Sequence, residues 1–175
     1  MKNIILRPER ETDREAIRLM VKEAFENAEY SDGDEHSLVD RLRLSAEYIP
    51  ELALVAECES EIVGFVMFTR ISVGSTPALA LAPLAVKQRW QHKGIGQALI
   101  ALGHQIARGM GESCSVVLGS PAYYCKSGYL PASDFGIRAP FDVPAEFYMV
   151  RPLCATGKLA EGIVCYSAAF GLPAE

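Results

Sequence analysis

Hydrophobic and polar positions follow two helical patterns near the start of the chain. Apolar residues recur on one face between residues 16 and 25, directly after Thr12 and Asp13, either of which can cap a helix. A shorter pattern of the same kind covers residues 35–45. We therefore expect two helices there, and the apolar residues 3–8 before them predict a short strand that ends at a proline.

The middle of the chain contains longer apolar runs that are rich in β-branched residues. Residues 51–58 and 62–70 are two such runs, and the short polar stretch between them predicts a hairpin turn. Gly64, within the second run, indicates a bulge or a close approach of the backbone. Residues 77–86 and 114–119 predict further strands.

A third helix is expected between these last two strands, at residues 94–110, where apolar positions again recur at helical spacing. Pro121 favours the first turn of one short helix that reaches Ser127. Residues 146–152 and about 162–167 resemble late strands. This order of elements is typical of a mixed α/β domain.

Composition limits the class of protein. Of the 175 residues, 50% are hydrophobic and 22% are charged, which suffices for a substantial core. We expect one domain, 1–175, with its core at about residues 3–152 and a C-terminal extension at 153–175. The net charge of −5 and the absence of a basic stripe in the sequence argue against a nucleic-acid partner.

The cysteines and the apolar segments indicate a cytoplasmic protein. Five cysteines are widely spaced without a Cys-x-x-Cys pair, and the histidines show no ligand spacing, so reduced thiols and no metal site are expected. The longest apolar stretch is interrupted by Pro83 and is too short to span a membrane. The N-terminus becomes charged too early for a signal peptide.

The stretch from Leu79 to Gly96 carries the candidate chemistry. Pro83 lacks a backbone N–H, so the strand should bulge or leave its neighbour there, and Leu84 to Val86 should keep backbone groups for a ligand that carries amides. The following loop opens a helix with Gly94 and Gly96. A helix N-terminus with closely approaching backbone favours an anion.

Three interpretations compete for these glycines. They can simply end a loop and allow tight packing of the helix. A dinucleotide fingerprint fits poorly, because Leu99 stands where the third glycine should be, and the sequence has no Gly-Lys-Ser/Thr of a P-loop. A pyrophosphate site at the helix start, beside a strand that pairs with amides, remains.

The motif itself resembles a known family. Gln-His-Lys-Gly-Ile-Gly at residues 91–96 is similar to the Gln/Arg-x-x-Gly-x-Gly/Ala signature of the GNAT superfamily of N-acetyltransferases. Pro-Leu-Ala-Val precedes it at residues 83–86, and Gln-Ala-Leu-Ile follows it at residues 97–100. Residues 121–129, with Pro-x-Tyr-Tyr-x-x-x-Gly-aromatic, resemble the YhbS-like branch. In the order of elements the resemblance spans about residues 4–132.

The resemblance implies a fold and a cofactor site. The fold would be a central, mixed but largely antiparallel sheet, splayed at the cofactor strand and flanked by helices. Acetyl-coenzyme A (acetyl-CoA) would be the acetyl donor. The resemblance places Leu84, Ala85 and Val86 against its pantetheine arm, and Gln91, His92, Lys93, Gly94, Ile95 and Gly96 against its pyrophosphate.

The resemblance also implies catalytic roles. Tyr124, four residues before the Gly-aromatic pair, would protonate the leaving thiolate, although a tyrosine of the core would occur in the same pattern. Tyr123 would serve packing or an adenine contact, and Cys125 would be inert. Residues 77–86 lack the acid that many relatives use as a base. Glu35 is our candidate base, and a solvated cluster that caps a helix is the alternative.

These inferences predict an N-acetyltransferase that moves an acetyl group to a primary amine of a small molecule, peptide or protein by direct transfer. Two other functions stay open: a non-catalytic acyl-CoA sensor, and an interaction domain that binds no coenzyme A. Release of free thiol with a panel of amines separates the enzyme from the sensor. The sequence is compatible with a homodimer.

Overall fold

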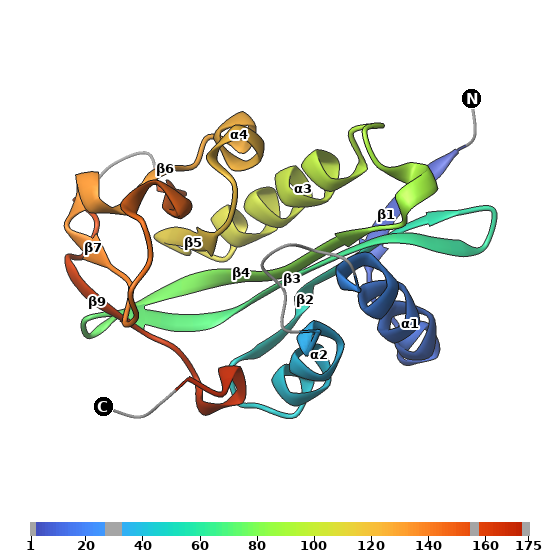
Figure 1. Cartoon of the computed structure of the whole chain (residues 1–175), viewed down its shortest axis with the longest axis horizontal. Coiled ribbons are helices and arrows are strands. Elements are labelled where there is room, and N and C mark those ends of the chain that lie inside the picture. Colours follow the sequence, from blue (N-terminus) through green and yellow to red (C-terminus); the bar gives the residue numbers. More distant parts are fainter. Residues whose placement is uncertain (1–2, 27–32, 155–157, 173–175) are drawn as a thin grey trace.

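The computed structural model of the chain describes residues 3–26, 33–154 and 158–172, and a sheet runs through its centre (Figure 1). The strands are β1 (Ile4–Pro8), β2 (Tyr48–Cys58), β3 (Glu61–Val73), β4 (Thr76–Val86), β5 (Cys114–Leu118), β6 (Leu130–Pro131), β7 (Ile137–Arg138), β8 (Tyr148–Pro152) and β9 (Gly162–Cys165). The helices are α1 (Arg14–Phe25), α2 (Glu35–Arg43), α3 (Ile95–Gly109) and α4 (Pro121–Tyr124).

The sheet is mixed and mostly antiparallel. Its strands follow the order β1-β2-β3-β4-β5-β8-β6, and every neighbouring pair is antiparallel except β4 and β5. Strand β9 pairs with the end of β3 at Ser72 and Val73, and runs parallel to β7. The fold class expected from the sequence is confirmed.

Strands β2 and β3 are apolar at consecutive positions because helices cover both faces of the sheet (Figure 1). Ala53 and Val55 pack in one buried cluster with α1 and α2. Leu54 and Ala56, which point to the opposite face, pack in another cluster with α3. A strand with two covered faces loses the alternation of apolar and polar residues that marks a half-exposed strand.

The β2–β3 hairpin agrees with the sequence prediction. Glu59 and Ser60 form its turn with positive φ angles of 49° and 67°, as a type I′ turn requires. Gly64 shows both of the features expected there. A register shift lies beside it, and an added Cβ would come within 3.0 Å of the Ile95 side chain. The absence of a side chain at Gly64 therefore lets α3 approach the sheet.

The part of the chain between β5 and β8 differs most from the sequence prediction. Strands β6 and β7 are two residues long, too short for a period to be recognised, and were not predicted. The short helix is α-helical only from Pro121 to Tyr124 and continues as a 3₁₀ turn to Ser127. Another 3₁₀ turn, Ala145–Phe147, delays the start of β8.

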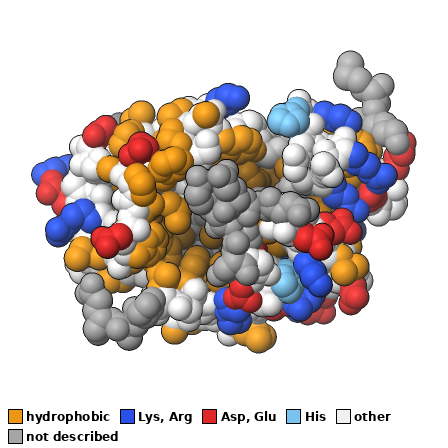
Figure 2. Space-filling model, in the orientation of Figure 1, with side chains coloured by type: hydrophobic (Ala, Val, Ile, Leu, Met, Phe, Trp, Pro, Cys, Tyr) orange, Lys and Arg blue, Asp and Glu red, His pale blue; other side chains and the backbone are white. Residues whose placement is uncertain are grey.

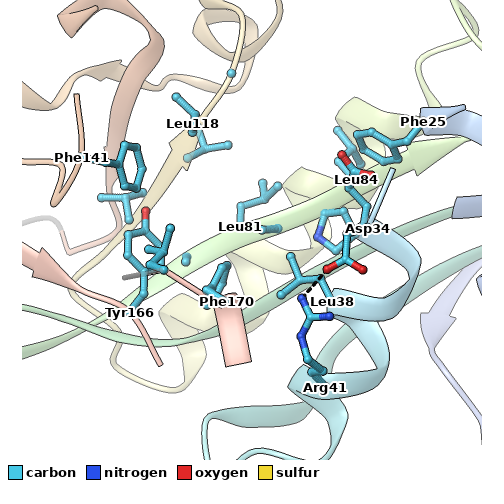
Figure 3. Close-up of a pocket in the computed structure, with 18 of the residues that line it drawn as sticks. Phe25, Asp34, Leu38, Arg41, Leu81, Leu84, Leu118, Phe141, Tyr166 and Phe170 are labelled. Carbon is cyan, nitrogen blue, oxygen red and sulfur yellow. Dashed lines mark hydrogen bonds and ion pairs between the residues drawn. The ribbon is translucent and has the colours of Figure 1, made fainter. Parts of the chain in front are cut away.

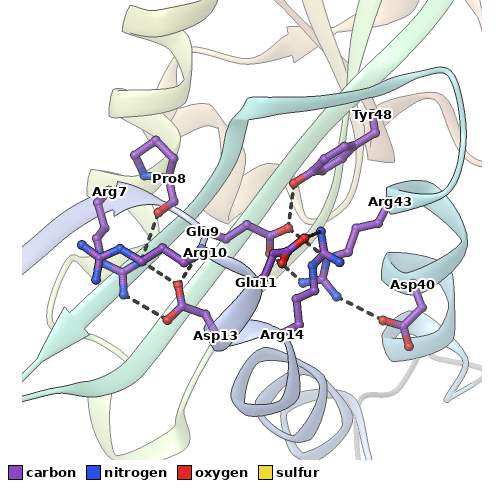
Figure 4. Close-up of polar contacts among 10 residues, drawn as sticks. All are labelled: Arg7, Pro8, Glu9, Arg10, Glu11, Asp13, Arg14, Asp40, Arg43 and Tyr48. Atoms are coloured by element: carbon purple, nitrogen blue, oxygen red, sulfur yellow. Dashed lines mark hydrogen bonds and ion pairs between the residues drawn. The ribbon is translucent and has the colours of Figure 1, made fainter.

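Buried ion pairs join the first helices to the sheet (Figure 4). Arg43 of α2 binds the carboxylate of Glu9 at 2.6 Å, and these side chains are only 4% and 3% exposed. Arg43 donates a second hydrogen bond to Glu9 at 2.9 Å, and the hydroxyl of Tyr48 donates a third at 2.8 Å. Because neither charge has access to water, each depends on its partner.

A second set of ion pairs fixes the start of α1. Arg7 of β1 lies 2.6 Å from Asp13 and 2.6 Å from Glu57 of β2. The backbone N–H of Arg10 also donates to Asp13 at 2.7 Å. Hydrogen bonding to Arg7 is the main reason that the pKa of Asp13 lies below its usual value, so this carboxyl is ionised at neutral pH.

We predict that Arg43→Met destabilises the fold by about 3–5 kcal/mol, because Glu9 is left buried and charged without its partner. Urea denaturation at neutral pH measures this change. Arg18→Met is the matched control. Arg18 binds Asp40, which also contacts Arg43. Because the Arg18 and Asp40 side chains are 46% and 42% exposed, loss of the Arg18–Asp40 ion pair should cost below about 1 kcal/mol. Equal losses would contradict a special role for burial.

Candidate active site

Strands β4 and β5 pair over a short stretch and then part. The pairing covers Leu79 and Ala80 of β4, and beyond it no described strand joins β4 on its β5 side. On the other side β4 stays paired with β3 as far as Val86, with a register shift around Pro83. The peptide bond before Pro83 is cis. The predicted parting of this strand is confirmed, and no strand within the described residues pairs with Leu84 to Val86 on this side, which we call the uncovered edge.

A cavity of about 580 Å³ lies between this edge and the start of α3, and we call it the loop cavity. It is lined by the end of β4, the loop before α3, the first turn of α3, and the α4 region. Most of the residues predicted to hold the cofactor line it: Leu84, Val86, Gln91, His92, Gly94, Ile95 and Gly96.

The loop before α3 has the geometry of an anion site. His92 and Gly94 adopt left-handed φ angles of 59° and 80°, which turn the chain into the helix. The backbone N–H groups of the first helical turn have no acceptor within the helix, and they carry the positive end of its dipole. The side-chain amide of Gln91 donates to the carbonyl of Val86 at 3.1 Å and so holds the loop against β4.

Two of the predicted cofactor residues point elsewhere. The side chain of Ala85 is buried in the cluster beneath α1 and α2, so only its backbone faces the open edge. The Lys93 ammonium lies 4.8 Å from the centre of the Trp90 ring, and its side chain lines a different depression. Lys126 lines the loop cavity instead. Lys126 could not be assigned from the sequence, because it lies about 30 residues after the loop that precedes α3.

A second cavity, of about 510 Å³, is bordered by β4, β5, α2 and the C-terminal part of the chain (Figure 3). We call it the aromatic cavity, because Phe25, Phe141, Tyr166 and Phe170 contribute to its wall. Leu84 and Tyr124 line both cavities. The two cavities therefore meet where β4 and β5 have parted.

Tyr124 stands at this junction. A Cβ added to Gly119 would overlap its ring, so the glycine at the end of β5 lets the tyrosine approach. The ring also packs edge-on against Tyr123 and Tyr129, with centres 5.1 Å and 5.7 Å away. Burial raises the pKa of Tyr124 above its usual value near 10, so the phenol keeps its proton at neutral pH.

A buried hydrogen-bond network surrounds Tyr129, whose ring packs against Tyr124. The hydroxyl of Tyr129 lies 2.9 Å from Ser115 Oγ and 3.1 Å from His104 Nε2. Burial, aided by the positive charges of two arginines, lowers the pKa of His104 to about 4. The imidazole is therefore neutral and serves as a hydrogen-bond partner. The spacing of His104, Ser115 and Tyr129 along the chain does not predict that they form this network.

Gln97 joins α4 to the first turn of α3. Its side-chain amide donates to the carbonyl of Tyr123 at 3.2 Å and accepts from the Ser127 hydroxyl at 2.5 Å. A Cβ added to Gly96 would overlap the hydroxyl of Tyr123. The absence of a side chain at Gly96 therefore also lets α3 pack against Tyr123, as the packing interpretation of these glycines expects.

Glu35 begins α2 and lines the aromatic cavity. Its neighbour Asp34 pairs with Arg41 at 2.7 Å, and this hydrogen bond lowers the pKa of Asp34. The Oε2 atom of Glu35 is buried and has no hydrogen-bond partner among the described residues. Asp34 occupies the N-cap position of α2, and its carboxylate also takes a hydrogen bond from Ser37 in the first turn.

Two further features of the described residues bear on the expected ligands. Within residues 3–26, 33–154 and 158–172, no three side chains of His, Cys, Asp or Glu come together in a way that could hold a metal ion. None of the helices in these ranges combines the length and apolar character needed to cross a membrane.

Comparison with known proteins decides the family. The model of the Acetyltransferase (GNAT) family matches residues 15–129. This range includes β4, α3, Tyr124 and the loop at residues 91–94 before α3, which we call the glycine loop. The chain belongs to the GNAT family. This assignment confirms the resemblance recognised from the motif.

Individual GNAT relatives agree with this assignment. The Escherichia coli protein named uncharacterized N-acetyltransferase YjhQ is 38% identical over 114 residues, 61% of this chain and 63% of that protein, so the match spans less than two thirds of that relative. The uncharacterized N-acetyltransferase YhbS of the same species is 29% identical over 86% of this chain and 87% of its own length.

Solved GNAT structures are similar over nearly the whole chain. The crystal structure of YhbS from Escherichia coli, in complex with CoA, has a TM-score of 0.88 at 25% identity and covers 98% of this chain and 94% of that one. A GNAT acetyltransferase from Brucella melitensis, in complex with acetyl-CoA, has a TM-score of 0.81 at 28% identity and covers 97% and 99%. The expected YhbS-like branch is confirmed.

We predict that Gly119→Ala lowers the free energy of unfolding by roughly 1–3 kcal/mol, because the added methyl must displace the buried Tyr124 ring. Gly109→Ala is the matched control. No atom lies within 4 Å of its added Cβ and it ends α3, so it should stabilise the fold by about 0.5 kcal/mol. Denaturation of both variants in urea measures the difference. Equal stability would show that the approach of Tyr124 to β5 is not a constraint.

Proposed function

We propose that this GNAT protein binds acetyl-CoA in the loop cavity and transfers its acetyl group to a primary amine in the aromatic cavity. The observation that carries the proposal is the meeting of the two cavities at Leu84 and Tyr124, beside the uncovered edge of β4. A reaction between two bound molecules needs such a junction, because the reacting atoms must come within about 3–3.5 Å of each other.

Several features support acetyl-CoA as the donor. YhbS and the Brucella melitensis protein have been solved with CoA and acetyl-CoA, and both resemble this chain over nearly its full length. The uncovered backbone of Leu84 to Val86 is suited to the amides of a pantetheine arm. The N–H groups at the start of α3, together with Lys126, are suited to a pyrophosphate.

The reaction we propose is a direct transfer. The amine nitrogen attacks the thioester carbonyl carbon, whose oxygen a backbone N–H near Val86 polarises. The carbon–nitrogen bond forms and the carbon–sulfur bond breaks, which leaves a thiolate. The nitrogen gives up one proton, the thiolate gains one, and the products are the acetamide and free coenzyme A. None of the described cysteines lines either cavity, which favours direct transfer over a cysteine-bound acetyl group.

Tyr124 and Glu35 are the proposed acid and base. Tyr124 lies at the junction and holds its proton at neutral pH, so it can supply the thiolate. Glu35 lines the amine side, and its buried Oε2 lacks a partner among the residues described. It can accept the proton of the nitrogen directly or through water. A carboxylate in this cavity would compensate for the missing acid on β4.

Binding of acetyl-CoA is the first test. Ligand at about 100 times its Kd should stabilise the fold by roughly 2.7 kcal/mol, seen as a rise in Tm. Gly94→Val should weaken this binding by about 10-fold or more, because it fills part of the loop cavity. Gly111→Val is the control: it has the same left-handed φ, 81° against 80°, and the same open surroundings, but does not line the cavity. Absence of any Tm shift with wild-type protein would refute the proposal.

We further expect Tyr124→Phe to keep the affinity for acetyl-CoA and to lower kcat by ~10²–10⁴-fold, because only the acidic hydroxyl is removed. Release of free thiol with an amine substrate measures turnover, and its complete absence in wild-type protein would favour the sensor. Tyr123→Phe is the paired control, since this ring contacts Tyr124 but lines only the loop cavity. If Tyr123→Phe abolishes turnover and Tyr124→Phe does not, the roles are reversed.

A further inference from the structure

The aromatic cavity has two chemically different ends. At one end Asp34 and Leu84 lie together, with Phe25 nearby (Figure 3). The charged residues in its lining, Asp34, Glu35 and Arg41, all come from α2 or the residue before it. Arg41 is paired with Asp34, so Glu35 supplies the excess negative charge, and we call this part the acidic end. Since Leu84 also borders the loop cavity, the acidic end adjoins the place proposed for the thioester.

The other end is formed by aromatic and aliphatic side chains. Phe141, Tyr166 and Leu118 lie together there in Figure 3. The Tyr166 ring centre is 6.3 Å from that of Phe141 and 4.8 Å from that of Phe170. The Tyr166 hydroxyl is hydrogen-bonded at 2.9 Å to the hydroxyl of Tyr148, a residue that does not line the aromatic cavity. Among the described residues, this end therefore presents ring surface, and the phenol oxygen of Tyr166 already has a hydrogen-bond partner.

Two apolar side chains that line the aromatic cavity are exposed to solvent. Leu118 is 50% exposed and Leu172 is 39% exposed, and both line the aromatic cavity. On the corresponding face of the molecule, hydrophobic side chains gather while charged ones stand mostly around the margin (Figure 2). Exposed apolar surface that lines a cavity indicates a ligand with apolar surface of its own.

The apolar wall is held in place by its neighbours. Strand β9, just before Tyr166, pairs with β3 at Val73, and Arg41 donates from α2 to the carbonyl of Ala169 at 2.9 Å. These contacts tie the C-terminal segment to the sheet and to the helix that carries Glu35. The distance between the acidic end and the aromatic end is thus set by the fold, and not by the ligand.

Building on the proposed acetyl transfer, we infer that the acceptor is a primary amine with an apolar alkyl or aryl body. Its amino group lies at the Asp34–Glu35 end, beside Leu84, where the ammonium form first loses one proton to Glu35 or to water before the neutral amine attacks. Its body extends toward Phe141, Tyr166 and Phe170. A polyamine, an amino sugar or a lysine in a charged peptide would have to place a second charge or several hydroxyls at the aromatic end. Among the described residues no charged side chain lines that end, so such groups would lose water without compensation.

A series of amines with the same reactive head tests the inference. Each methylene that reaches the apolar wall should improve kcat/KM by about 4-fold, so n-hexylamine should exceed n-propylamine by on the order of 50-fold. Hexane-1,6-diamine has the same carbon chain with a second ammonium at its far end. It should be at least about 10-fold worse than n-hexylamine, after allowance for its two equivalent amines.

Leu118→Asp provides a test of position. A carboxylate at the aromatic end should lower kcat/KM for n-hexylamine and raise it for the diamine, which reverses the preference between the two. Leu130→Asp is the matched control, because Leu130 is 47% exposed and lies outside both cavities. It should leave the preference unchanged. Tm values of both variants, with and without acetyl-CoA, exclude a general loss of folding.

The outcomes separate this inference from the proposed function. Turnover of all three amines at similar kcat/KM, or a preference for the diamine in the wild-type protein, overturns the apolar acceptor and leaves acetyl transfer intact. If no amine releases thiol, calorimetry with n-hexylamine on the CoA-bound protein decides. Binding that Leu118→Asp abolishes and Leu130→Asp preserves supports the apolar acceptor site while refuting transfer. Absence of binding overturns the inference.

Discussion

The parting of β4 from β5 after Ala80 is the constraint on which both cavities depend. Paired strands lie about 4.8 Å apart, which leaves no room for a ligand between them. Here the bulge at Pro83 redirects β4 while its pairing with β3 continues to Val86, so the sheet remains intact on one side and opens on the other. Tyr124 fills part of the opening, and the cavities occupy the rest.

The walls of this opening need support, because an unpaired edge alone would be free to close or fray. On the α3 side, Gln97 and the Tyr129–Ser115–His104 network hold α4 and Tyr124 against buried structure. On the α2 side, the buried Glu9–Arg43 pair fixes the helix that carries Glu35 to the first strands. Buried polar groups of this kind require one arrangement, since an unsatisfied group costs free energy in any other.

The two cavities come from different parts of the chain. The loop cavity is built from residues within 15–129, the range matched by the GNAT family model. The far wall of the aromatic cavity comes from Phe141, Tyr166 and Phe170, which lie beyond that range. This division explains why the family relation supports a shared acetyl donor, while the acceptor must be inferred from the surfaces of this chain.

The sequence by itself determined the features that depend on neighbouring residues. The helices, the long strands, the bulge at Pro83 and the glycine loop all follow from local periodicity, backbone geometry or a contiguous motif. Only the tertiary structure decided which distant residues share a cavity. It placed Lys126 in the loop cavity and Lys93 outside it, and it placed Glu35 and Tyr166 at the two ends of one cavity. The physical reason is that strand pairing and helix packing, which bring these side chains together, join residues far apart in the chain and leave no local period to read.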